Sequence, residues 1–234
     1  MREPNIYIKK AEERNAKIKY IFETHIHADF VSGHLTLSKI TNAPIIFGPN
    51  AELDYDCTIA GDLQEFKLGK IVLQVIHTPG HTLESSIILL KNEKNEKISI
   101  FTGDTLFLGD VGRPDLAQKS WELSQRDLAG MLFDSLRKKI MPLPDNLIVY
   151  PAHGAGSACG KNMMKETHDT LGNQKKVNYA LREDMSKKEF VEEVLNGLES
   201  PPEYFAMNVK MNQTGYEDLS LIHISEPTRP LYSS

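Results

Sequence analysis

The chain has 234 residues, of which 40% are hydrophobic, and its formal net charge is -5. This length and composition suffice for a buried core and favour one large domain, or one domain with an appendage. The charge includes no strongly basic stretch, which speaks against nucleic acid as a partner, and no apolar run approaches the roughly 20 residues of a membrane span. We therefore expect a soluble enzyme that has neither nucleic acid nor a membrane as a partner.

Cysteine usage and the N-terminus bear on the cellular compartment. Cys57 and Cys159 are too few for a disulfide framework, and they are compatible with a reducing environment. Residues 1–4 carry no signal-peptide pattern. These features predict a cytoplasmic protein.

The first predicted elements lead into the motif on which the functional prediction depends. A helix is expected over residues 5–15 and a short apolar strand over residues 18–23. The strand is followed by His25, His27 and Asp29, whose spacing lets two imidazoles and a carboxylate converge on one cation from a loop. Clustered histidine and aspartate at such spacing indicate a metal site. Because a metal site at a sheet edge normally has more strands beside it, we expect N-terminal strands to be missing.

The middle of the chain repeats this arrangement of a strand that ends near a histidine. The elements predicted here are a loose helix followed by strands, at residues 35–40, 45–47, 64–66 and 71–76. The last of these strands runs into a Gly/Pro loop that contains His77 and His81. His81, which follows Gly80, is the better candidate for a metal ligand, and His77 is expected to be structural or to orient a ligand.

A second hairpin ends in a carboxylate. Its strands are predicted over residues 85–90 and 98–102, and Asp104 follows the second strand directly after a glycine. An aspartate in a turn can simply be exposed to solvent. The two upstream histidine loops of the same design favour a ligand role for Asp104.

The last predicted strand also ends near a histidine. An amphipathic helix over residues 122–140 precedes a strand at 146–150, and His153 follows that strand. Cys159 lies in the glycine-rich loop beyond it, either as a buried inert thiol or, near Lys161, as a more reactive thiolate. Four successive strand ends therefore present histidine or aspartate at one edge of the sheet.

The C-terminal part is predicted to contain two helices and then a linker. Helices are expected over residues 165–181, where His168 is a solvated side chain, and over 186–198. Residues 201–218 are expected to be a linker toward a missing downstream segment. Residues 219–234 resemble the translation of a transposase adapter used in sequencing-library preparation, and we expect them to be an assembly artefact.

In chain order, four motifs resemble the metallo-β-lactamase superfamily: Thr-His-Ile-His-Ala-Asp at 24–29, Thr-Pro-Gly-His-Thr at 78–82, Thr-Gly-Asp at 102–104 and Pro-Ala-His at 151–153. The resemblance covers about residues 17 to 215. It implies an α/β fold, an αββα sandwich, formed by residues 1–200 as an N-terminally truncated domain. Within the superfamily, residues 103–116 resemble the persulfide dioxygenases, and residues 23–34 and 152–161 resemble bacterial members that carry C-terminal rhodanese domains.

This resemblance implies one Fe(II) ion per chain, held by two histidines and one aspartate. Those ligands map onto His25, His81 and Asp104. Such a set leaves open positions that suit O2 and substrate together. Binuclear zinc hydrolases of the superfamily have a histidine directly after the motif aspartate, and Phe30 stands at that position here. The catalytic residues that orient ligands and water are then His27, Asp29 and His153.

The implied reaction is the oxidation of a low-molecular-weight thiol persulfide, such as glutathione persulfide, by O2 to sulfite and thiol in sulfide detoxification. Arg113 and Cys159 are the candidates for substrate binding. Arg113 either holds the anionic thiol carrier or pairs with Asp110 or Asp115. The alternatives are a zinc-dependent thioester hydrolase of the hydroxyacylglutathione hydrolase type and an inert product of misassembly. The sequence leaves open whether the chain forms a homo-oligomer.

Overall fold

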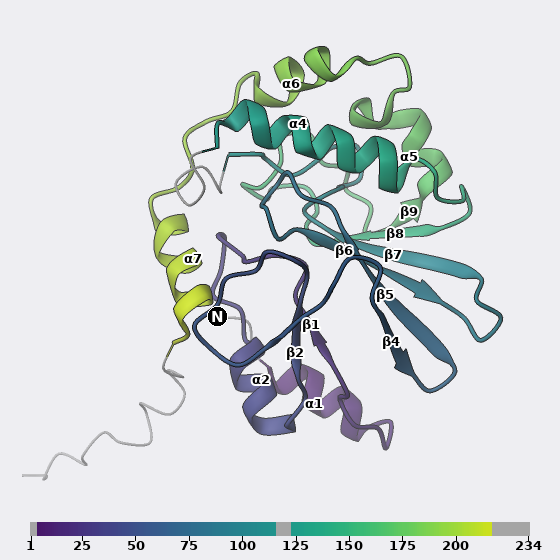
Figure 1. Ribbon diagram of the computed structural model, residues 1–234, viewed down its shortest axis with the longest axis vertical. Helices are drawn as coiled ribbons and strands as arrows, with labels where there is room; N and C mark the ends of the chain where they lie inside the picture. Colours follow the sequence, from purple (N-terminus) through teal and green to yellow (C-terminus); the bar gives the residue numbers. More distant parts are fainter. Residues whose placement is uncertain (1–3, 116–122, 217–234) are drawn as a thin grey trace, which may run out of the picture.

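The computed structural model describes residues 4–115 and 123–216, and Figure 1 shows how their helices and strands are arranged. Two β-sheets lie at the centre, with helices on both outer sides. The predicted α/β sandwich of two sheets is confirmed. The predicted adapter-derived residues 219–234 lie outside the described ranges. Within those ranges, no helix is both long and apolar enough to cross a membrane.

The strands form a small parallel sheet and a larger mixed sheet. The small sheet has the order β1-β2-β3 and consists of β1 (Ile21–Phe22), β2 (Ile45–Phe47) and β3 (Thr58–Ile59). The larger sheet runs in sequence order through β4 (Glu65–Leu68), β5 (Ile71–His77), β6 (Ser86–Lys91), β7 (Lys97–Gly103), β8 (Ile148–Pro151) and β9 (Asp169–Thr170). Its neighbouring strands are antiparallel except β7 and β8, which are parallel. The sequence does not predict β3 and β9, because, unlike the equally short β1, neither lies within a longer apolar run.

Helices cover the two sheets from opposite sides. The helices α1 (Asn5–Glu12) and α2 (His34–Thr41) lie on the side of the small sheet. The larger sheet is covered by α4 (Gln125–Ser135), its π-helical continuation (Leu136–Ile140), α5 (Leu171–Val177) and α6 (Lys187–Leu195). The predicted helix over 165–181 is wrong at its start, because Thr170 caps α5 with its side chain and pairs with β8.

The larger sheet buries side chains on both faces. In β6, Ile87 and Leu89 join the core cluster that includes Leu132 of α4, whereas Ile88 joins a cluster with Ile46 of the small sheet. Successive side chains of a strand point to opposite faces, so the unbroken apolar run of β6 reflects burial on both sides. This packing gives the ends of β5, β7 and β8 a rigid support.

Within the stretch predicted to be a linker, Tyr204–Thr214 form the helix α7, and the linker role itself stays a prediction. Proline is tolerated in the first turn of a helix, and the N–H of Phe205 donates to the carbonyl of Pro202 there. The helix buries Phe205 and Asn212. The two prolines that suggest a linker therefore mark the start of a helix.

Candidate metal centre

Strand directions bring four loops together at one edge of the sheets. The strands β5, β7 and β8 run in the same direction, because β5 and β7 are both antiparallel to β6 and β8 is parallel to β7. The end of β1 joins them, since the carbonyl of Thr24 accepts a hydrogen bond from the N–H of Ser86 at 2.8 Å. The loops that follow these four strands carry His25, His81, Asp104 and His153. The predicted convergence of strand ends is confirmed.

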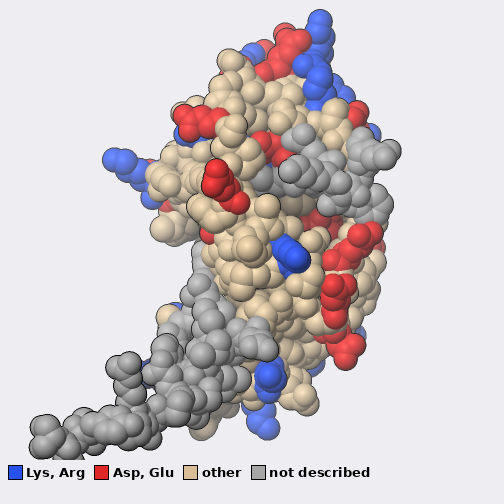
Figure 2. Space-filling model, turned by 90° about the vertical axis from the view of Figure 1, so that its left-hand side faces the viewer, with Lys and Arg blue, Asp and Glu red and all other residues tan. Residues whose placement is uncertain are grey.

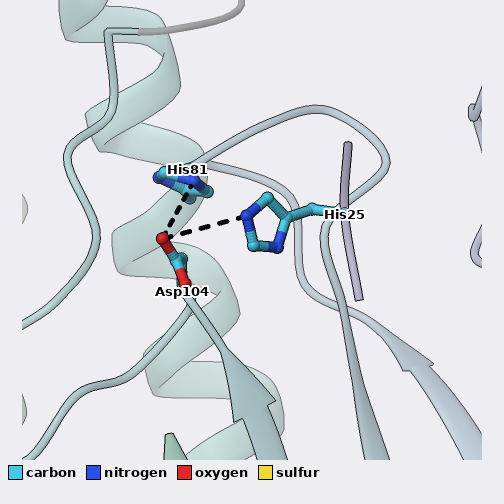
Figure 3. A group of neighbouring side chains, drawn as sticks. All are labelled: His25, His81 and Asp104. Atoms are coloured by element: carbon cyan, nitrogen blue, oxygen red, sulfur yellow. Dashed lines mark ion pairs between the residues drawn. The ribbon is translucent and has the colours of Figure 1, made fainter. Parts of the chain in front are cut away.

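Three buried side chains from three of these loops face one point (Figure 3). The Nε2 atoms of His25 and His81 lie 3.8 Å and 3.5 Å from Oδ2 of Asp104. Both separations are too long for hydrogen bonds. They match donor atoms that share one cation at about 2.1 Å from each. His25, His81 and Asp104 are each at most 2% exposed and form a group that could hold a metal ion.

A second group adjoins the first through the other oxygen of Asp104. Nε2 of His153 lies 3.4 Å from Oδ1 of Asp104 and 3.4 Å from Oδ2 of Asp29. Nδ1 of His27 lies 3.8 Å from Oδ1 of Asp29. His27, Asp29 and His153 thus form a second group at metal-ligand spacing. The ring of Phe30, which offers no ligand atom, packs 4.4 Å from that of His27.

The state of Asp104 tests whether these residues fit a cation. No N–H or O–H group of the described residues donates to either carboxylate oxygen. Burial, together with the charge of Asp29, raises the pKa of Asp104 to about 7, although the charge of His27 acts in the opposite direction. A buried carboxylate that has only a weak thiol donor, that of Cys159, is costly when ionised, and a bound cation removes that cost. Asp104 therefore fits a metal ligand.

The two histidines are in the state that a metal requires. Burial and neighbouring histidines hold the pKa of His25 well below its usual value, and burial lowers that of His81 to about 4. Nδ1 of His81 lies 2.8 Å from the carbonyl oxygen of Arg113. Because a carbonyl only accepts, Nδ1 carries the proton, and Nε2 presents its lone pair toward Asp104.

Gly112 allows this close packing. Its N–H donates to the carbonyl of Asp104 at 3.0 Å. A Cβ at this position would lie 2.1 Å from that carbonyl oxygen and 2.9 Å from Nδ1 of His81. Any side chain at residue 112 would therefore displace two candidate ligands.

The structure places Arg113 in one of the two predicted arrangements. Its guanidinium donates to both carboxylate oxygens of Asp115 at 2.7 Å and to the carbonyl of Glu199 at 2.6 Å. Asp110 instead accepts hydrogen bonds from the backbone N–H groups of Val111, Lys161 and Asn162. Arg113 is thus a buried part of the loop, and its carbonyl orients His81. Its predicted contact with an anionic substrate remains a prediction.

The other sequence candidates also have defined places. Cys159 is 2% exposed, and burial beside the charges of Asp104 and Asp29 raises its thiol pKa. Its thiol forms a group at metal-ligand spacing with Asp104 and His153. The predicted role of Cys159 in substrate binding stays a prediction. His77 is structural, as expected, with Nε2 at 2.7 Å from the carbonyl of Leu83. His168 is exposed, as expected, and stacks on Tyr150.

Sequence reasoning missed the side chains that hold the loop of His25 and His27. Oε1 of the buried Glu84 accepts the N–H of Ile26 at 2.8 Å, between the two histidines. Oε2 of Glu23 lies 3.2 Å from Nε2 of His27. Burial alone would lower the pKa of His27, but the hydrogen bond and charge of Glu23 raise it. The one signal in the sequence for Glu84 is its position three residues after His81, in the same loop.

Two solved structures resemble this chain over most of its length. The metallo-β-lactamase of Staphylococcus aureus subsp. aureus COL is 33% identical and has a TM-score of 0.84, covering 93% of this chain and 64% of that chain. ETHE1 from Myxococcus xanthus is 26% identical and has a TM-score of 0.73, covering 89% of this chain and 82% of that chain. No protein-family model matches the chain.

The curated relatives include two kinds of enzyme. A probable hydroxyacylglutathione hydrolase of Schizosaccharomyces pombe is 26% identical over 194 residues, which are 74% of this chain and 71% of that protein. The mitochondrial persulfide dioxygenase ETHE1 of Mus musculus is 30% identical over 143 residues, which are 61% of this chain and 51% of that protein. The chain therefore spans only about half the length of the mouse enzyme.

Proposed function

Because the chain has the metallo-β-lactamase fold, with a persulfide dioxygenase and hydroxyacylglutathione hydrolases among its homologues, we propose that it is an Fe(II)-dependent persulfide dioxygenase. Two features of the site carry this proposal together. His25, His81 and Asp104 form a buried group, and Phe30 lies beside His27. Two histidines and one carboxylate with open positions suit Fe(II) and O2 chemistry. The phenylalanine stands where a binuclear zinc site would have a ligand.

The proposed reaction converts one persulfide, one O2 and one water into one thiol, one sulfite and two protons. Fe(II) held by the three ligands would supply the redox chemistry that joins the oxygen atoms to the outer sulfur of the persulfide. The chain itself provides a site in which Asp104 and both ligand histidines are buried, so water has little access to that side.

Proton transfer falls to the second group of side chains. Nε2 of His153 lies 3.4 Å from Oδ2 of Asp29 and 3.4 Å from Oδ1 of Asp104. A water that contacts both groups from the side of the site would lose one proton to the Asp29 carboxylate and one to a ring nitrogen of His153. His27, held by Glu23, closes the same side of the site.

The second candidate is a zinc-dependent thioester hydrolase. It is favoured by the second group, His27, Asp29 and His153, which lies at metal-ligand spacing and adjoins Asp104. Metal-bound hydroxide attacking a thioester carbonyl would use such a site.

Metal loading separates the two candidates. The protein is loaded anaerobically with Fe(II), and O2 uptake and sulfite are measured with glutathione persulfide. We expect one sulfite per O2 consumed. Hydrolysis of a glutathione thioester by the zinc form, with no O2 uptake by the iron form, would refute the dioxygenase. Alanine at His25, His81 or Asp104 should abolish iron binding, and alanine at the exposed His168 is the matched control.

A further inference from the structure

The side chain of Asn212, near the end of α7, contacts the loop that carries His27 and Asp29. Its Nδ2 donates to the carbonyls of His27 and Phe30, both at 2.8 Å, and its Oδ1 accepts the N–H of Ser32 at 2.9 Å. The side chain therefore uses both N–H groups and its oxygen on one loop. The loop and the helix are about 180 residues apart in the sequence.

The loop needs these partners because it belongs to no helix or strand. Residues 27–32 lie between β1 and α2 and have no regular backbone pairing. Buried backbone N–H and C=O groups need hydrogen-bond partners, and Asn212, which is 2% exposed, provides three of them. Asn208, one turn earlier on α7, donates to the carbonyl of Ala28 at 2.8 Å. Tyr216, just after the helix, donates to the carbonyl of Ser32.

The loop is held at its two ends by different parts of the fold. Glu84, from the loop after β5, binds the N–H of Ile26 next to the ligand His25. Asn212 binds the stretch from His27 to Ser32, which carries His27 and Asp29 of the second group. The position of the metal ligand and the position of the neighbouring catalytic candidates therefore depend on separate contacts.

We propose that Asn212 is a positioning residue of the metal centre, which holds His27 and Asp29 on the side of Asp104 where substrate and water react. The helix α7 then helps to position the side chains of the site. This inference rests on the proposed metal centre and is independent of the choice between iron and zinc chemistry. It assigns a site role to a segment in which the sequence predicts a linker.

Two substitutions at Asn212 test the contact in different ways. Asn212→Asp keeps the size and the acceptor for Ser32, but it replaces the two donors with an oxygen that faces two carbonyls. Asn212→Ala removes all three contacts, and since alanine is the better helix former, α7 itself is not weakened.

Figure 2 shows the side of the molecule on which α7 lies, where uncharged surface fills most of the middle. Met207→Ala, at a residue of α7 that is 61% exposed, is the matched control.

The first readout is the absorption spectrum of the Co(II)-loaded protein, which reports the coordination and its surroundings without requiring either activity. We expect both Asn212 variants to bind Co(II) with the wild-type stoichiometry and to give a changed spectrum. Hydrogen exchange of residues 27–32 should become faster, and kcat should fall roughly ten- to a hundredfold with a much smaller change in KM. Asn208→Ala, which removes one contact, should give a smaller change of the same kind.

Several results would overturn the proposal. Wild-type spectra and kcat in both Asn212 variants would show that the amide does not position the site. An equal effect of Met207→Ala would assign the change to the helix surface. Loss of folding in both Asn212 variants by circular dichroism would make the residue a support of the whole fold. Absence of O2 uptake in the wild-type iron form would refute the dioxygenase alone, because the Co(II) spectra and exchange rates would still be measured.

Discussion

Replacing Asp104 with asparagine should stabilise the metal-free protein while abolishing metal binding. In the folded chain, burial raises the pKa of Asp104 from its usual 3.8 to about 7. Between these values the folded state keeps a proton that the unfolded state has lost, so the free energy of unfolding falls as pH rises. This window spans about three pH units. Since each unit changes the free energy of unfolding by about 1.4 kcal/mol, the total change is about 4 kcal/mol. Asparagine has no such charge to bury.

The assay is urea unfolding of both proteins in EDTA from pH 4 to 8. We expect the advantage of Asp104→Asn to grow with pH up to about 7 and then to level off. The difference between variants is the quantity to measure, because His81, with its pKa lowered to about 4, has the opposite pH dependence below 6.5. Asp145→Asn, at a side chain that is 72% exposed, is the control. An advantage that is equal at pH 5 and pH 8 would refute the reasoning, as would equal stabilisation of both proteins by added Zn(II).

Three further predictions concern neighbouring groups. Glu84→Leu leaves the N–H of Ile26 without its acceptor and should cost about 1 to 3 kcal/mol in urea unfolding and weaken metal binding, whereas Glu84→Gln keeps an acceptor; equal losses would contradict this. Phe30→His adds a ligand beside the second group and should raise the metal content from one to two ions per chain by elemental analysis; one ion in both proteins would show that Phe30 does not exclude the second ion, and two ions in both would refute a single-metal wild type. Burial raises the thiol pKa of Cys159, so iodoacetamide at pH 8 should alkylate Cys57 first, as followed by mass spectrometry. Alkylation of Cys159 before Cys57 would contradict this.

Much of the metal centre could be predicted because its signals are local. A β-branched or apolar run followed by a loop with glycine or proline marks a strand end, and histidine or aspartate at that point marks a candidate ligand. The direction of β5, β7 and β8 then follows from the hairpins and from one parallel pairing. All six predicted histidine and aspartate residues therefore lie in the two adjoining groups of the site.

The contacts that fix these residues could not be predicted in the same way. The pairing of Arg113 with Asp115 is local, but the choice between Asp110 and Asp115 depends on backbone N–H groups near residues 161–162 that reach Asp110 from far along the chain. The helix α7 has only a short apolar stripe, because among the described residues Phe205 is its one buried apolar residue and Val209, one turn later, is partly buried. A helix that packs through asparagine side chains leaves no hydrophobic period in the sequence.

The two supports of the histidine loop separate the part proposed to bind the metal from the part proposed to transfer protons. His25 precedes the carboxylate contact of Glu84, and that contact belongs to the hairpin loop that also carries His81. The two histidine ligands therefore keep their relative position whenever β5 and β6 are paired. His27 and Asp29 follow that contact and are held by hydrogen bonds from Asn208 and Asn212 of α7 to the backbone of their loop. A change in α7 can thus alter the reacting side of the site without disturbing the ligand histidines, because the ligands are fixed by the sheet and their neighbours by the helix.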